Sequence, residues 1–80
     1  MNNTEFILKF FERLFDERSE LQRKITELNF FIKVSPRYKE LNDFQKSALV
    51  KKLKIMGEYR DILKAQINNI EEEYDIKTND

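Results

Sequence analysis

Two arginines, Arg18 and Arg60, interrupt heptad stripes whose other members are all apolar or aromatic. A guanidinium group offers a rigid fork of N–H donors that can bind a phosphate through two hydrogen bonds. If both side chains point into a pocket, they could hold a phosphate-bearing ligand. The alternative is that their aliphatic stems cover the seam while the charged groups reach carboxylates such as Glu17, Glu20 or Asp61.

Other side chains could complete a site for a phosphate or a base. Tyr59 could supply a stacking ring beside the space that the only glycine, Gly57, opens in its helix, although helix packing could also explain this glycine. Lys24 flanks the seam as a further cation. Arg37 and Tyr38 could grip a base or phosphate, or Tyr38 could form a hydrophobic lid. The candidate ligand-binding residues are therefore Arg18, Lys24, Arg37, Tyr38, Tyr59 and Arg60.

Several kinds of chemistry lack their side chains in this sequence. The chain has no cysteine and no histidine, so it lacks the common nucleophiles, general bases and zinc ligands. One glycine cannot build a phosphate-binding loop or a dinucleotide-binding turn. A carboxylate-only site for a divalent cation has no supporting loop. We expect a protein that is not an enzyme and that has no metal site and no cofactor.

Hydrophobic periodicity predicts the elements that position these residues. Apolar residues spaced by four and three positions lie on one seam of an α-helix, as in helices that pack side by side. A break at Ser35 and Pro36 separates two such stripes. The first stripe is Ile7, Phe11, Leu14, Arg18, Leu21, Ile25, Leu28 and Ile32, and the second is Leu49, Leu53, Met56, Arg60, Leu63, Ile67, Ile70 and Tyr74.

The fold class that follows is all-α: an antiparallel helical hairpin of two long helices with a short helical turn between them. We expect one domain over residues 1–76 and a disordered tail over 77–80. If Ile32 pairs with Leu49 across the hairpin, Arg18 lies opposite Leu63 and Arg60 lies opposite Leu21. The two arginines therefore fall in adjacent layers near the middle of the rod.

Capping residues predict where the helices begin and end. Thr4 is a plausible N-cap of the first helix, and Ser35 before Pro36 suits the start of a short helical turn. Asn42, with Gln45 three residues later, resembles a capping box for the last helix. The expected bounds are about 4–34, 36–41 and 43–75.

The helices carry more apolar surface than one hairpin seam requires. Aromatic residues flank the first seam on both sides, and Ala48, Ile55, Tyr59 and Ile62 form another stripe on the second helix. Such a surface marks an interface, so we expect a homo-oligomeric bundle. A third helix or a tail folding back within one chain is the alternative. The candidate interface residues are Phe6, Phe10, Phe11, Phe15, Ile55 and Ile62.

The charge distribution is uneven although the net charge is zero. Residues 36–56 carry six basic and two acidic side chains, whereas residues 57–80 carry three basic and seven acidic ones. The balance argues against a partner such as bulk nucleic acid. The gradient fits a solvated surface, an anion-binding end, or head-to-tail attraction between protomers. No apolar run approaches the roughly 18 residues of a membrane span, so we expect a soluble, cytoplasmic protein without a membrane partner.

These positions resemble a family of small helical-hairpin proteins found in crAss-like and other tailed phages. The resemblance covers about residues 13–67, and its most specific part is the string Met56, Tyr59, Ile62 and Leu63. The other matching residues are Arg13, Leu14, Glu17, Glu20, Leu21, Lys24, Ile25, Leu28, Phe31, Ile32, Leu41, Gln45, Leu49, Val50, Leu53 and Ile67.

The chain departs from the family pattern at three positions of the second helix. Lys52 stands where glutamine is expected, Ile55 where a small residue is expected, and Gln66 where arginine is usual. All three lie on the secondary face of this helix. An inherited polar site on that face is therefore in doubt.

By a looser analogy, the chain is similar to phage sponge proteins that sequester nucleotide signals of the bacterial defence systems CBASS and Thoeris. The analogy implies a phage-encoded, non-enzymatic immune-evasion protein acting in the infected host cytoplasm. Its ligand would be a cyclic oligonucleotide or an ADP-ribose derivative, held in pockets of a homo-oligomer. The alternatives are a helix-mediated adaptor or inhibitor of another protein, using Phe6, Phe10 and Phe15, and a minor structural protein of the virion.

Overall fold

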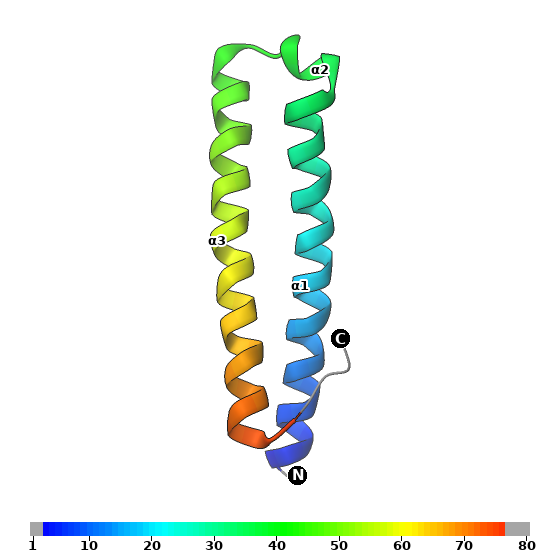
Figure 1. The fold of residues 1–80 in the computed structure, drawn as a ribbon, viewed down its shortest axis with the longest axis vertical. Helices are drawn as coiled ribbons and strands as arrows, with labels where there is room; N and C mark the ends of the chain where they lie inside the picture. Colours follow the sequence, from blue (N-terminus) through cyan, green and yellow to red (C-terminus); the bar gives the residue numbers. More distant parts are fainter. Residues whose placement is uncertain (1–2, 77–80) are drawn as a thin grey trace.

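The computed structural model describes residues 3–76 and shows a helical hairpin (Figure 1). Two long helices, α1 (Asn3–Val34) and α3 (Asp43–Tyr74), run antiparallel, and the short helix α2 (Pro36–Lys39) lies between them at the turn. The molecule is a rod of 53 × 22 × 20 Å. This architecture confirms the predicted hairpin fold. Among the described helices, none combines the length and the apolar character that crossing a bilayer requires.

Most helix boundaries lie where the capping residues predict them. The Ser35 hydroxyl accepts a hydrogen bond from the Arg37 amide at 3.2 Å, and the Asn42 side chain accepts one from the Gln45 amide at 2.9 Å. Each cap satisfies a backbone N–H that has no partner within the helix. The predicted role of Thr4 is wrong, because α1 already begins at Asn3 and Thr4 lies inside its first turn.

The C-terminal end of α3 folds back onto the hairpin. Asp75 adopts a left-handed conformation (φ 52°), and the Ile76 amide donates to the Glu71 carbonyl at 3.2 Å, which is the bond of a Schellman motif. The turn places Ile76 against the core. This realises part of the alternative in which the chain end folds back. The predicted disordered tail, 77–80, lies outside the described residues.

The core lies along one seam between α1 and α3. Arg60 hydrogen-bonds Gln22 across the seam, and Gln22 is the next residue after Leu21, the predicted partner of Arg60. Every buried side chain among the described residues occupies a predicted seam position. On α3 they lie in the half of the helix away from the turn, whereas on α1 they extend past the middle of the helix as far as Ile25. The buried residues are Phe11, Leu14, Leu21, Ile25, Leu63, Ile67 and Ile70.

The phenylalanines of α1 divide between the core and the surface. Phe11 is only 7% exposed because it packs inside the seam, so a single chain has little Phe11 surface to offer to a second copy, and its place in an interface stays a prediction. Phe10 and Phe15 are half-buried against the core, whereas Phe6 is exposed and stacks on Phe10 with ring centroids 6.1 Å apart. An interface at this end would therefore use Phe6 and the outer edges of Phe10 and Phe15.

Truncating Leu63, which is 2% exposed, should strongly destabilise the hairpin. Leu63→Ala removes apolar contacts and leaves a cavity, so we expect the free energy of unfolding to fall by about 2–5 kcal/mol. The control is Val50→Ala on the exposed surface of the same helix, which should change it by less than about 0.5 kcal/mol. Urea denaturation followed by circular dichroism measures both, and equal effects would contradict this description of the core.

Replacing Gly57 with alanine should stabilise the chain. An added Cβ would meet only the Nη2 atom of Arg60, at 3.9 Å, which is an ordinary van der Waals contact. Close packing within the chain therefore does not require this glycine. Gly57→Ala should raise the free energy of unfolding by about 0.5–1 kcal/mol because alanine favours the helix. A decrease in the same urea experiment would mean that another molecule approaches the backbone here.

Candidate functional site

A depression near the middle of the rod brings together the two seam arginines. Arg18, Ser19 and Gln22 contribute from α1, and Arg60 and Lys64 contribute from α3. Its volume is about 670 Å³. Each helix supplies a pair of residues four positions apart, which places both members of the pair on one helical face. We call this surface the central depression.

Arg60 is the residue that joins the two walls of the central depression. Its Nη1 donates to the Oε1 atom of Gln22 at 3.2 Å, and its Nε lies 3.6 Å from a carboxylate oxygen of Asp61. The Nε atom is buried and makes no hydrogen bond among the described residues. The donors of this guanidinium are therefore only partly used by the protein, and a buried donor without a partner is energetically unfavourable.

Arg18 is held by an aromatic ring on its own helix. Its guanidinium carbon lies 4.5 Å from the centroid of the Phe15 ring, a cation–π geometry. This contact orients the side chain along α1 and leaves it in the lining of the central depression. Of the carboxylates that the predicted alternative names, Asp61 lies beside the Arg60 guanidinium.

The central depression has the chemistry of an anion site. Among the described residues, its lining carries three cations, a hydroxyl and an amide, and no carboxylate. Arginine forks bind phosphate oxygens in pairs, and lysine adds a point charge. The depression contains no histidine, thiol or paired carboxylate that could act as a nucleophile or general base. The arrangement suits binding of a phosphate-bearing molecule.

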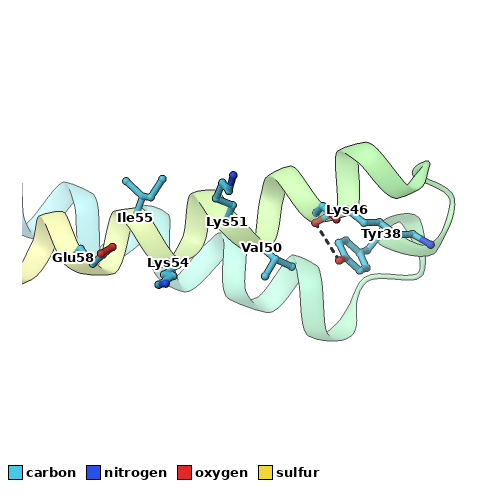
Figure 2. Close-up of a pocket in the computed structure, with 8 residues that line it drawn as sticks. Tyr38, Lys46, Val50, Lys51, Lys54, Ile55 and Glu58 are labelled. Carbon is cyan, nitrogen blue, oxygen red and sulfur yellow. Dashed lines mark hydrogen bonds between the residues drawn. The ribbon is translucent and has the colours of Figure 1, made fainter.

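A second surface lies near the turn, on the outer side of α3 (Figure 2). Tyr38 closes the turn end of this groove, because its hydroxyl donates to the Lys46 carbonyl at 3.4 Å and its ring meets Phe31 edge-on at 6.1 Å. The Lys46 ammonium lies 5.9 Å from the Tyr38 ring centroid. These contacts hold the Tyr38 ring over the hairpin end. The groove is lined by Tyr38, Lys46, Ser47, Val50, Lys51, Lys54, Ile55 and Glu58.

The remaining candidate residues do not join either surface. Lys24 lines a separate depression with Lys52, and Arg37 is highly exposed and paired with Glu40 at 3.7 Å. Tyr59 is adjacent in sequence to Arg60, but successive helical residues point about 100° apart, so its ring lies on another side of α3. In one protomer, the structure therefore brings together Arg18 and Arg60 but not the six candidates as one site.

Three residues of the central depression were absent from the sequence prediction. Gln22 lies four positions after Arg18, and Lys64 lies four positions after Arg60, so both were accessible from helical spacing. Ser19 has no comparable signal in the sequence. The lysines of the groove near Tyr38 belong to the basic segment 36–56, whose excess of positive charge is evident in the sequence.

A cluster of ion pairs on α1 lies outside both surfaces. Arg23 donates to Glu20 and Glu27 on α1, and the hydrogen bond from Arg23, followed by its charge, lowers the pKa of Glu20. Both acidic side chains are exposed, which is typical of a solvated helix surface. Within residues 3–76, no group of three acidic side chains is placed to hold a metal ion.

Comparison with known proteins identifies one family. No curated protein and no solved structure matches the chain. The family model named Sequestin matches residues 8–69, a stretch that runs from the start of the core in α1 through the turn to the last turns of α3. This stretch includes every residue of the central depression. The chain belongs to the Sequestin family.

Proposed function

We propose that this protein sequesters a nucleotide-derived defence signal in pockets of a homo-oligomer and does so without catalysis. The ligand class is a cyclic oligonucleotide or an ADP-ribose derivative. In this proposal the protein is encoded by a phage and acts in the cytoplasm of the infected bacterium. The family name supports sequestration as the general mode of action.

The central depression is the observation that carries this proposal. It gathers Arg18, Arg60 and Lys64 on one surface, and only part of the Arg60 fork is used within the chain. Phosphate groups on a nucleotide would supply acceptors for the part of the Arg60 fork that the chain leaves unused, and charge-assisted hydrogen bonds are the stronger kind. A sequestering protein needs this affinity and no reactive group.

Bases need a different kind of contact from phosphates. Tyr59 is 41% exposed and Tyr38 borders the groove near the turn, so each offers an aromatic edge or face to a base. In one protomer these rings lie away from the central depression. We propose that assembly of several copies brings a tyrosine, and Lys24 or Arg37, from one copy toward the cations of another.

A second candidate function is a helix-mediated adaptor or inhibitor that grips another protein. One observation favours it: Phe6 and Phe10 line a small depression with Glu5, Lys9 and Arg13 at the open end of the rod. An aromatic surface with mixed charges around it is typical of a protein interface. The other alternative is a minor structural protein of the virion.

Direct titration of the full-length protein tests the proposed function. The probes are cyclic dinucleotides, cyclic trinucleotides and cyclised ADP-ribose compounds, each measured by isothermal titration calorimetry. We expect at least one class to bind at micromolar concentration or below. If no probe binds and the protein instead captures a host polypeptide, the adaptor function replaces sequestration.

Arg60→Ala should weaken binding of that ligand by about 10- to 100-fold. This loss corresponds to about 1.5–3 kcal/mol, the contribution of hydrogen bonds to a charged group. Arg60→Lys keeps the charge but loses the fork, so it should restore only part of the affinity. The ligand affinity is measured by the same calorimetry.

The matched control for Arg60→Ala is Arg23→Ala. Arg23 is also a helical arginine, but its partners are Glu20 and Glu27 on the outer surface of α1. Arg23→Ala should leave ligand affinity within about twofold, because exposed ion pairs contribute little. Equal losses in the two variants would rule out the central depression as the binding site.

A further inference from the structure

Helix α3 carries a second apolar stripe that does not face α1. We call Phe44, Ala48, Ile55, Tyr59 and Ile62 the outer stripe. Phe44 is 76% exposed, Ile55 56% and Ile62 59%, which are high values for large apolar side chains. Their spacing of three, four or seven residues keeps them on one helical face, so they form a seam of the kind that pairs helices.

We propose that the outer stripe pairs with the same stripe of a second copy, antiparallel, around a two-fold axis near Ile55. This inference deepens the proposed function, since it names the partner surface of the homo-oligomer. In a two-fold interface the same patch serves both copies, so each contact occurs twice. The outer stripe is self-complementary in this way: Ile62 of one copy faces the small residue Ala48 of the other.

Flanking charges match in the same register. Lys51 and Glu58 border the outer stripe on the same side, and Figure 2 shows Lys51 and Ile55 projecting toward the same side of α3. Within one helix they are seven residues apart, about 10 Å, which is too far for an ion pair. Across the antiparallel pair, Lys51 of one copy lies level with Glu58 of the other, twice.

The ends of the rods give an independent reason for this register. With the axis near Ile55, Asp43 of one copy lies level with Ile67 of the other, so residues 68–74 extend past the start of the partner α3. The exposed carboxylates Glu72 and Glu73 then lie beside the turn of the other copy, which carries Arg37 and Lys39. The acidic end of each rod thus meets the basic end of its partner.

The pairing also changes the groove near the turn. Ile55, Lys51 and Glu58 belong both to the groove lining and to the edge of the outer stripe. A second copy on the outer stripe would stand along this edge as a wall. The groove in Figure 2 would then become a crevice between protomers.

Single cysteines test the geometry, because the natural chain has none. Disulfides form only where Cα atoms come within about 7 Å. Ile55→Cys should crosslink to itself under oxidising conditions, since it lies near the axis. Ile62→Cys alone should not, because two copies of position 62 would be about 21 Å apart along the helices. An equal mixture of Ile62→Cys and Ala48→Cys should crosslink.

Efficient self-crosslinking by Ile62→Cys would overturn the antiparallel register. Failure of Ile55→Cys to crosslink would overturn the interface itself. The readout is the mass of the non-reduced protein by electrophoresis and mass spectrometry.

Charge reversal tests the cross-copy ion pair. Lys51→Glu and Glu58→Lys should each raise the dimer dissociation constant, measured by analytical ultracentrifugation, by about tenfold or more. The double variant Lys51→Glu/Glu58→Lys should return the dimer dissociation constant to near the natural value. Such recovery is not expected if the two residues act independently of each other. Failure of the double variant to recover would overturn the pairing of these residues.

Ile55→Glu should lower the mass in solution toward that of one copy, 9.8 kDa. Val50→Glu is the matched control, since Val50 is also a β-branched, exposed residue of α3 but lies outside the outer stripe. It should leave the mass unchanged. Equal effects of the two substitutions would contradict the interface.

Ligand titrations separate this inference from the proposed function. If the crosslinks and charge reversals fail while the natural protein binds a nucleotide probe, the pairing is wrong and the proposed function stands. If the dimer behaves as expected and no probe binds, the pairing stands without the ligand.

Discussion

The contact between α1 and α3 along one seam is the interaction on which the rest of the structure depends. Its seven buried residues form the whole described core, and they run from Phe11 to Ile25 on α1 and from Leu63 to Ile70 on α3. A chain of 80 residues without disulfides has few other ways to gain stability. Such a small core leaves large apolar side chains in water, which gives the chain a physical reason to associate.

The seam arginines reduce the stability that this contact could supply. Arg18 and Arg60 occupy positions where leucine or isoleucine would bury more apolar surface, and a desolvated charge is unfavourable unless it is paired. Arg18 recovers some stability over the Phe15 ring, and Arg60 through Gln22 and Asp61. Polar residues at interior heptad positions are best attested as determinants of register or of a specific site. The central depression lies where these two arginines interrupt the apolar seam.

Local patterns predicted the fold because a hairpin depends on them. The heptad stripes defined the seam, and Ser35 and Asn42 marked the helix starts. The heptad spacing places Phe11 in the seam, and the structure buries it there. The stripe predicted on the second helix starts at Ala48 and omits Phe44, which lies four positions earlier on the same helical face. The site was harder to predict, because the paths of the arginine and tyrosine side chains depend on neighbours across the hairpin that spacing alone does not specify.

The shallow surface of a two-helix hairpin would link the proposed ligand binding to the proposed assembly. Two packed helices present shallow surfaces, whereas ligand sites bury most of a small molecule in a concave pocket. A concave wall requires a further layer of helices, and the outer stripe and the Phe6 surface are where such a layer could attach. A ligand held between copies would bind the assembled state and not the separate rods, so mass action would make it stabilise the assembly. Assembly around a ligand would then bury the apolar surface that a lone hairpin leaves in water. The same event would supply acceptors for the Arg60 donors that the chain uses only in part.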